Sequence, residues 1–227
     1  MRVHILGTRG EIARSAPRYR RHAGILVDRQ ILLDLGEASY LRYRPKAIFI
    51  SHLHPDHAVF VRAPMALTCA VYVPEPTRAI PSAIVLRGAV DIAGFRVAPV
   101  ATHHSHRVRS VGFLVEQGSH RLFYSSDLVS MGRLARAALG RLDAVITDGS
   151  FMRRGGLVRV DPSSGRRFGH AGIPDLVRLF SRFSHRIIIT HFGSWFYDDV
   201  RAARRRIAQL SDGVRVDAAY DGMVVTV

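Results

Sequence analysis

The chain has 227 residues, 48% of them hydrophobic, and a formal net charge of +15 at pH 7. This length accommodates a substantial core, and we expect one globular domain over residues 1–227. No apolar run approaches the roughly 18 to 20 residues that a membrane span needs, and residues 1–7 lack the pattern of a signal peptide. The single cysteine, Cys69, cannot form an internal disulfide, which agrees with a reducing compartment. We therefore expect a cytoplasmic protein with no membrane partner.

Arginine dominates the basic residues, since Lys46 is the only lysine among the 33. Arginine forms paired hydrogen bonds to phosphate and stays protonated, so the charge favours a phosphate-bearing or nucleic-acid partner. A general bias of the composition towards arginine would give the same count. The sequence leaves both interpretations open, and a homodimer is one of the oligomeric states that it allows.

Short strands are expected in the first part of the chain, on either side of an arginine-rich loop over residues 9–21. The apolar and β-branched runs that predict these strands span residues 3–7, 24–28, 31–34 and 47–50. Residues 51–57 follow as a loop, because Pro55 keeps the residue before it out of the helical region. A helix over residues 59–66 is expected behind this loop.

The middle and end of the chain alternate strands with a few helices. Further strands are predicted over residues 69–73, 83–86, 95–100, 110–116, 121–127, 144–148, 186–190, 214–218 and 223–227. Helices are predicted over residues 134–139, 173–183 and 198–209. Residues 152–169 are rich in Gly, Ser and Arg and are expected to form a polar loop outside the core.

The densest chemical signal is the segment His52-Leu53-His54-Pro55-Asp56-His57, directly after a buried strand. In an extended segment His52 and His54 project to the same side. Imidazole and carboxylate groups are ligands suited to zinc, iron or manganese. Other predicted strands also end in Asp or His, which is how a site is built along one edge of a sheet sandwich. The sequence therefore predicts a metal site at that edge.

These residues in this order resemble the motifs of the metallo-β-lactamase superfamily, over nearly the whole chain. Asp34 matches the first motif, His52-x-His54-x-Asp56-His57 the second, a histidine among residues 103–106 the third, Asp127 the fourth and His191 the fifth. The resemblance implies an α/β (α+β) fold, a four-layer αββα sandwich with a dinuclear metal site.

The same resemblance implies a role for each residue that matches a motif. His52, His54 and one later histidine would hold one ion, and the spacing favours His106 over His104 and His103. The second ion would be held by Asp56, His57 and His191. Asp127 would bridge the two ions, and Asp34 would orient the ligand loop. The cofactor expected is thus a pair of divalent ions, zinc first, with manganese or iron as alternatives.

Within the superfamily the chain is most similar to the phosphodiesterase branch, which includes RNase Z and small cyclic-phosphate phosphodiesterases. The similarity lies in Asp34 with its neighbours, in the setting of His106 before Gly112-Phe113, and in Asp148-Gly149-Ser150-Phe151 followed by Gly169-His170. It departs from the tRNA-processing members, because no insertion long enough for their arm is present and Asp148 stands where they have glutamate.

We therefore expect a phosphodiesterase in which a metal-bound hydroxide attacks a phosphodiester of RNA or a nucleotide. Asp56 would orient the nucleophile, and His170, held by Asp148, would protonate the leaving group. Phosphate oxygens would be bound by arginines of the 152–169 loop, namely Arg153, Arg154, Arg159, Arg166 and Arg167. The alternatives are a thioester, ester or lactam hydrolase with the same ligands, and a basic nucleic-acid-binding protein without turnover.

Overall fold

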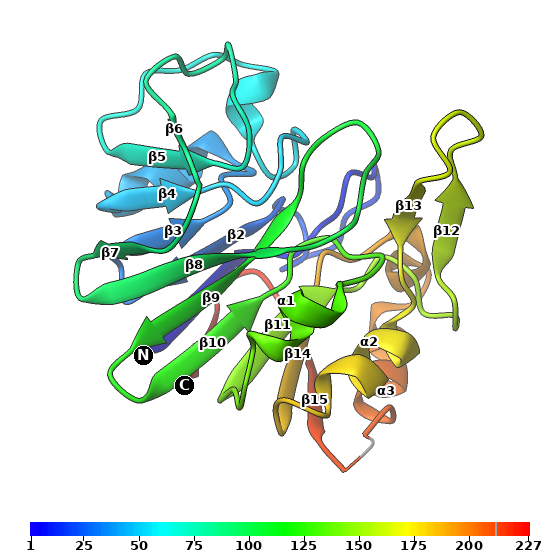
Figure 1. Ribbon diagram of the computed structural model, residues 1–227. Helices are drawn as coiled ribbons and strands as arrows, with labels where there is room; N and C mark the ends of the chain where they lie inside the picture. The colour runs from blue at the N-terminus through cyan, green and yellow to red at the C-terminus, as the bar shows by residue number, and fades with distance from the viewer. Residues whose placement is uncertain (212) are drawn as a thin grey trace.

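The computed structural model describes residues 1–211 and 213–227, and within them two seven-stranded sheets hold most of the regular structure (Figure 1). The first sheet has the order β16-β1-β2-β3-β4-β5-β6. Its strands are β1 Arg2–Gly7, β2 Gly24–Val27, β3 Ile31–Leu33, β4 Ala47–Phe49, β5 Ala70–Val73, β6 Ile84–Val85 and β16 Met223–Thr226.

The second sheet has the order β15-β14-β11-β10-β9-β8-β7. Its strands are β7 Val90–Ile92, β8 Phe95–Ala101, β9 Val111–Gln117, β10 His120–Tyr124, β11 Ala144–Asp148, β14 Arg186–Thr190 and β15 Arg215–Ala218. A separate hairpin, β12 Leu157–Val160 with β13 Arg167–His170, stands out from the body of the molecule (Figure 1).

Helices cover the outer faces of both sheets. The α-helices α1 Arg133–Ala137, α2 Ile173–Phe180 and α3 Val200–Ala208 lie on the outer side of the second sheet, where α2 and α3 bury apolar side chains (Figure 1). The first sheet is covered by the 3₁₀-helices η1 Ala38–Tyr43 and η2 Val59–Val61, through Tyr40 and Phe60. A third 3₁₀-helix, η3 Ser194–Tyr197, precedes α3. The four-layer sandwich expected from the sequence is confirmed.

The apolar runs of the sequence are explained by strands that are buried on both faces. In β4, Ala47 and Phe49 pack between the two sheets while Ile48 packs under the outer helices. In β14, Ile188 faces the other sheet and its neighbours Ile187 and Ile189 face α2 and α3. Such strands lack the polar alternation of half-exposed ones.

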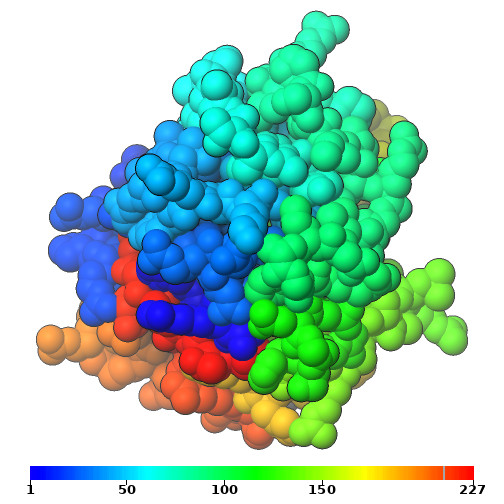
Figure 2. Space-filling view, turned by 90° about the vertical axis from the view of Figure 1, so that its left-hand side faces the viewer, coloured from blue at the N-terminus to red at the C-terminus, as the bar shows by residue number. Residues whose placement is uncertain are grey.

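The two ends of the chain meet in the first sheet, where β1 pairs antiparallel with β16. Figure 2 shows the N-terminal and C-terminal segments side by side on this side of the molecule. The turn before β16 carries Asp221, which accepts hydrogen bonds from Thr8 Oγ1 and from the backbone N–H groups of Arg20 and Arg21. This contact fixes the arginine-rich loop after β1, part of which borders the site described below.

Strand direction brings the polar strand ends to one edge. Strands β3 and β4 run parallel in the first sheet, as do β10, β11 and β14 in the second. Asp34, the 51–57 loop, Asp127, Asp148 and His191 all lie at the carboxyl ends of these strands. The prediction that strand ends gather at one edge of the sandwich is confirmed.

Two sequence expectations about secondary structure were wrong. The helix expected over residues 59–66 is only the single turn η2, because Val59 and Val61 are β-branched and Pro64 opposes continuation. The 152–169 segment is not an irregular loop, since it forms the β12–β13 hairpin. No helix in the described residues has both the length and the apolarity to cross a membrane.

Candidate metal centre

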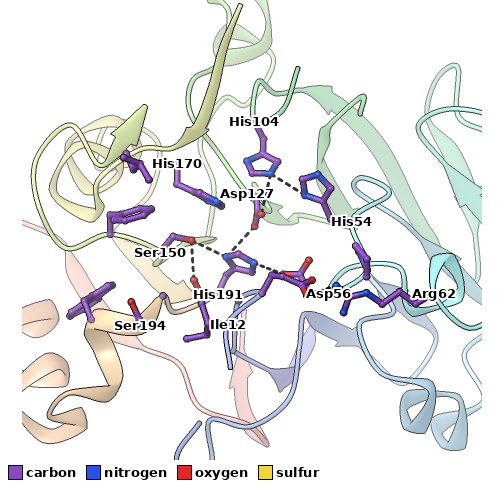
Figure 3. Close-up of a pocket in the computed structure, with 17 residues that line it drawn as sticks. Ile12, His54, Asp56, Arg62, His104, Asp127, Ser150, His170, His191 and Ser194 are labelled. Carbon is purple, nitrogen blue, oxygen red and sulfur yellow. Dashed lines mark hydrogen bonds and ion pairs between the residues drawn. The ribbon is translucent and has the colours of Figure 1, made fainter. Parts of the chain in front are cut away.

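A cavity of about 530 Å³ opens at the edge where the parallel strands end (Figure 3). Its lining combines imidazole and carboxylate groups with apolar side chains such as Ile12, Phe151 and Trp195. The polar lining residues are Glu11, His54, Asp56, Arg62, His104, Asp127, Ser150, His170, His191 and Ser194.

The first ligand group consists of His52, His54, His104 and one oxygen of Asp127. His54 Nδ1 lies 3.1 Å from His52 Nε2 and 3.3 Å from His104 Nε2. Asp127 Oδ2 lies 3.7 Å from His52 Nε2 and 3.5 Å from His104 Nε2. A tetrahedral zinc ion, with ligands about 2.0–2.1 Å away, needs ligand atoms roughly 3.4 Å apart. The group has that spacing.

Electrostatics also suit the first group to a metal. Burial lowers the pKa of His52 well below its usual value and that of His104 to about 4. Burial also lowers the pKa of His54. All three imidazoles are therefore neutral at pH 7, which leaves a nitrogen lone pair on each for coordination.

The second ligand group consists of Asp56, His57 and His191, next to the other oxygen of Asp127. His191 Nε2 lies 2.9 Å from Asp56 Oδ2, and His57 Nε2 lies 3.7 Å from that same oxygen. Asp127 Oδ1 lies 3.2 Å from His57 Nε2 and 3.3 Å from His191 Nδ1. The two oxygens of Asp127 thus face different ligand groups, as a bridging carboxylate would.

Two buried atoms at the second group lack a hydrogen-bond partner within the described part of the chain, namely His57 Nε2 and Asp127 Oδ1. Burial opposes protonation of His57, but Asp127, Asp56 and Asp34 outweigh it and raise its pKa well above the usual value. Burial likewise opposes protonation of His191, but Asp127, Asp148 and Asp56 outweigh it and raise its pKa to about 10. This excess of buried carboxylate calls for positive charge, which divalent cations supply. The residues present therefore fit a divalent metal pair.

Asp34 contacts His57 of the second group, in the ligand loop that the family resemblance assigned it to orient. Its Oδ2 accepts hydrogen bonds from His57 Nδ1 at 2.7 Å, Tyr124 Oη at 2.7 Å and Ser51 Oγ at 2.9 Å. Its Oδ1 accepts the Ser51 N–H at 2.7 Å. These contacts turn His57 Nε2 towards the centre. Ser51 and Tyr124 were not predicted, because serine and tyrosine at a strand end carry no signal of their own.

The structure brings His104 and not His106 into the first ligand group, which corrects the expectation of His106. His104 Nδ1 donates to the carbonyl oxygen of Gly169 at 2.8 Å, and Gly169 N–H donates back to the His104 carbonyl. His106 lies outside the centre, where its ring packs on Phe168 with 4.3 Å between centroids. The β12–β13 hairpin holds His104 in place, and the position of this hairpin cannot be predicted from the spacing of residues in the sequence.

His170 and Asp148 lie together beside both ligand groups, as predicted. His170 Nδ1 donates to Asp148 Oδ2 at 2.7 Å, and its ring centroid lies 4.7 Å from that of His104 (Figure 3). Burial lowers the pKa of His170, but the Asp148 carboxylate outweighs it, so the net shift is upward. The contact with Asp148 thus favours the protonated form of this imidazole, which lines the cavity.

The arginines predicted to bind phosphate do not line the cavity. Arg153 and Arg154 are exposed, and Arg153 Nε donates to the carbonyl oxygen of Gly156. Arg166 and Arg167 line a second cleft, of about 730 Å³. The arginine that borders the cavity is Arg62, paired with Glu11 at 2.6 Å. The hairpin explains part of this correction, because it carries Arg166 and Arg167 to the second cleft.

Arg159 belongs to the same correction. It lies on β12, is exposed and does not line the cavity. Arg62 follows the single turn η2, and no sequence pattern distinguishes it from the other arginines. Only the folded arrangement brings this side chain to the cavity mouth.

Comparison with known protein families identifies the group to which this fold and this centre belong. Residues 41–192 match the model of the "Beta-lactamase superfamily domain". The chain belongs to the metallo-β-lactamase superfamily. Members of this superfamily are metal-dependent hydrolases, and the His/Asp groups of the present chain are able to hold divalent metal. A comparison with curated proteins finds no match.

Solved structures share the superfamily fold over the whole chain. The metallo-β-lactamase fold protein YhfI from Bacillus subtilis is 17% identical, with 99% of each chain covered and a TM-score of 0.72. A diphosphatase of the PhnP family is 14% identical, with 100% of this chain and 97% of that chain covered and a TM-score of 0.70. The short form of human tRNase Z is 19% identical, with 100% and 99% covered and a TM-score of 0.65. At these identities the likeness concerns the fold alone.

Proposed function

We propose that this protein is a dinuclear zinc phosphodiesterase. The observation that carries the proposal is the His170–Asp148 pair, which places an imidazole held by a carboxylate in the cavity beside the two ligand groups. His52, His54 and His104 would hold one ion and Asp56, His57 and His191 the other, with Asp127 between them. Zinc is favoured because imidazole-rich sets of four ligands at this spacing suit it.

When bound, two such ions act as Lewis acids and lower the pKa of a water to about 7. Asp56 is placed to accept a hydrogen bond from the attacking water and so to orient it. His170 donates its Nε2 proton to the leaving oxygen, while Asp148 holds Nδ1. An alkoxide is a poor leaving group, so this proton transfer is what cleavage of a phosphodiester requires.

The remaining walls of the cavity suit the rest of a phosphodiester substrate. Arg62 at the mouth can bind a phosphate oxygen, in the role first expected of the hairpin arginines. Ile12, Phe151 and Trp195 offer apolar surface to the organic part of the substrate and exclude water. Trp195 is held in place by the hydrogen bond from its Nε1 to the carbonyl oxygen of Gly149.

The second cleft suits additional phosphates and favours RNA or a nucleotide as the partner. It lies on the other side of the His103–His106 segment from the cavity, and its basic lining includes Arg107, Arg109, Arg166 and Arg167. Among the described residues none of these four arginines forms an ion pair with a carboxylate. Free guanidinium groups around one cleft favour a polyanion.

The proposal is tested by comparing substrates with the zinc-loaded protein. We expect hydrolysis of bis-p-nitrophenyl phosphate with a kcat/KM well above that for thioester or β-lactam substrates, and loss of this activity in a His52→Ala/His54→Ala variant. Faster turnover of a thioester would assign the protein to the other hydrolase class. Nucleic-acid binding that survives the double substitution, without hydrolysis, would indicate a binding protein.

A further inference from the structure

Two Asp-x-Ser turns of this chain have the same local hydrogen bonds in different surroundings. In Asp148-Gly149-Ser150, Asp148 Oδ1 accepts from Ser150 N at 2.9 Å and from Ser150 Oγ at 2.6 Å. In Asp161-Pro162-Ser163, Asp161 Oδ1 accepts from Ser163 N at 2.8 Å and from Ser163 Oγ at 2.7 Å. The first turn is buried at the end of β11, whereas Ser163 is exposed at the tip of the hairpin.

Ser150 has one contact that Ser163 lacks. Its Oγ lies 3.0 Å from Nδ1 of His191, a contact that Figure 3 marks. A serine hydroxyl has one proton, and an ionised carboxylate can only accept. The short contact with Asp148 therefore takes the hydroxyl proton, in preference to the carbonyl oxygen of His191 at 3.4 Å. In the contact between Ser150 and His191, the donor must then be the imidazole Nδ1–H.

This direction of donation determines which nitrogen of His191 is free. With Nδ1 protonated, the lone pair of the neutral ring lies on Nε2, which is directed at Asp56 Oδ2 and the second ligand group. Asp127 Oδ1, at 3.3 Å from Nδ1, competes for the same proton, and Ser150 is the nearer acceptor. Ser150 therefore favours the tautomer in which Nε2 is the ligand atom.

Ser150 also connects His191 to the His170–Asp148 pair. Asp148 accepts a hydrogen bond from Ser150 Oγ on Oδ1 and another from His170 Nδ1 on Oδ2. A row of hydrogen bonds thus runs from His191 through Ser150 and Asp148 to His170. The backbone N–H of Leu128 adds a further bond to Asp148, at 3.2 Å, so this carboxylate is fully held in place.

We propose that Ser150 is a positioning residue, which fixes the nitrogen that His191 presents to the second metal and links that ligand to Asp148. The proposal rests on the metal centre of the proposed function. Outer hydrogen-bond partners of metal-binding histidines commonly contribute about 10–100-fold in metal affinity. Loss of the Ser150 hydroxyl should therefore weaken one of the two zinc sites by about that factor and leave the other unchanged.

The experiment is a zinc titration of metal-free protein against a chromophoric chelator, for the wild type, Ser150→Ala, Ser150→Thr and Ser163→Ala. We expect weaker binding at one site in Ser150→Ala, near-complete recovery in Ser150→Thr, and no change in Ser163→Ala, which loses the same turn contact. Thermal unfolding of the metal-free variants shows whether Ser150→Ala alters the fold more than Ser163→Ala does. If it does, Ser150→Val replaces it, because valine matches threonine in shape and lacks the hydroxyl.

The inference is overturned if Ser150→Ala and Ser150→Val bind zinc at both sites as tightly as the wild type. It is also overturned if Ser163→Ala weakens zinc binding equally, since the effect would then belong to the turn and not to the contact with His191. A wild-type protein that binds no zinc would instead contradict the proposed function itself. The two failures are therefore distinguishable.

Discussion

The two halves of the candidate centre share Asp127 but differ in chemistry. The first half gathers three imidazoles, of which His54 is half-buried, and His104 is held by the backbone of the β12–β13 hairpin. The second half gathers two imidazoles and Asp56, all buried, and buried polar side chains hold the imidazoles from behind. Neutral imidazoles dominate the first half, whereas buried carboxylates surround the imidazoles of the second.

This difference predicts different consequences of damage. The imidazoles of the first half are neutral and leave no buried charge unbalanced when the metal is absent, so their loss should affect metal binding more than folding. In the second half, removal of a buried carboxylate leaves donors without acceptors, which costs free energy of folding as well as metal affinity. Substitutions in each half can therefore separate the two effects.

Asp127→Asn should have the largest effect, because it damages both halves. The variant loses the bridging charge between the two ligand groups, so we expect reduced binding of both ions. Its kcat/KM for a phosphodiester should fall by more than the roughly 10²–10⁴-fold that loss of a single general acid causes. Metal analysis together with kinetics checks this, and an Asp127→Asn protein that retained either ion at wild-type affinity would contradict the bridging role.

His170→Ala should spare both halves and lower turnover alone. For a phosphodiester with an alkoxide leaving group we expect kcat to fall about 10²–10⁴-fold with unchanged zinc content. A p-nitrophenolate leaving group needs little protonation, so bis-p-nitrophenyl phosphate should be affected much less. Comparison of kcat for the two substrates measures the difference. An equal loss of kcat on both would show that His170 is not the general acid.

His104→Ala and His106→Ala form a matched pair that tests the first half only. Loss of His104 should weaken one zinc site by more than about 100-fold, since even outer partners contribute 10–100-fold. Loss of His106 should leave both sites unchanged, because its ring lies on Phe168 outside the centre. Zinc competition titrations of the two variants measure this difference. Weaker zinc binding in His106→Ala but not in His104→Ala would instead identify His106 as the ligand.

Asp34→Ala should have the smallest effect on turnover but a clear effect on folding. It therefore tests the contribution of buried charge in the second half to stability. We expect a loss of about 10–100-fold in affinity at one zinc site. The free energy of unfolding should fall by roughly 1–3 kcal/mol for each buried donor left without an acceptor. Urea unfolding of the metal-free protein measures this. Asp143→Ala, which removes an acceptor of the exposed Arg121 N–H, is the control and should change little.

Much of the centre was predictable from the sequence, for a physical reason. Asp34, Asp127 and His191 follow apolar strands, and parallel strands end at the same edge, so their positions follow from strand assignment. All three lie next to or within sharp turns, since Asp34, Ser126 and His191 have positive φ angles of 61°, 54° and 57°. Positive φ angles at residues other than glycine are uncommon and cluster at turns and functional sites.

The parts that were not predictable depend on the β12–β13 hairpin. It selects His104 over His106 through backbone bonds to Gly169, and it carries Arg166 and Arg167 into the second cleft. The alternation Leu157-Val158-Arg159-Val160 was a usable signal for a strand, but the surrounding Gly and Ser residues obscured it. The packing position of the hairpin depends on tertiary contacts, which cannot be inferred from the local spacing of residues.

The most direct test of the central claim is a zinc titration of metal-free protein in which bound zinc and hydrolysis of bis-p-nitrophenyl phosphate are measured in the same samples. The account predicts two bound ions per chain, with hydrolysis that rises until both halves are filled. Full hydrolysis without metal, or two bound ions with no hydrolysis of any phosphodiester, would contradict it.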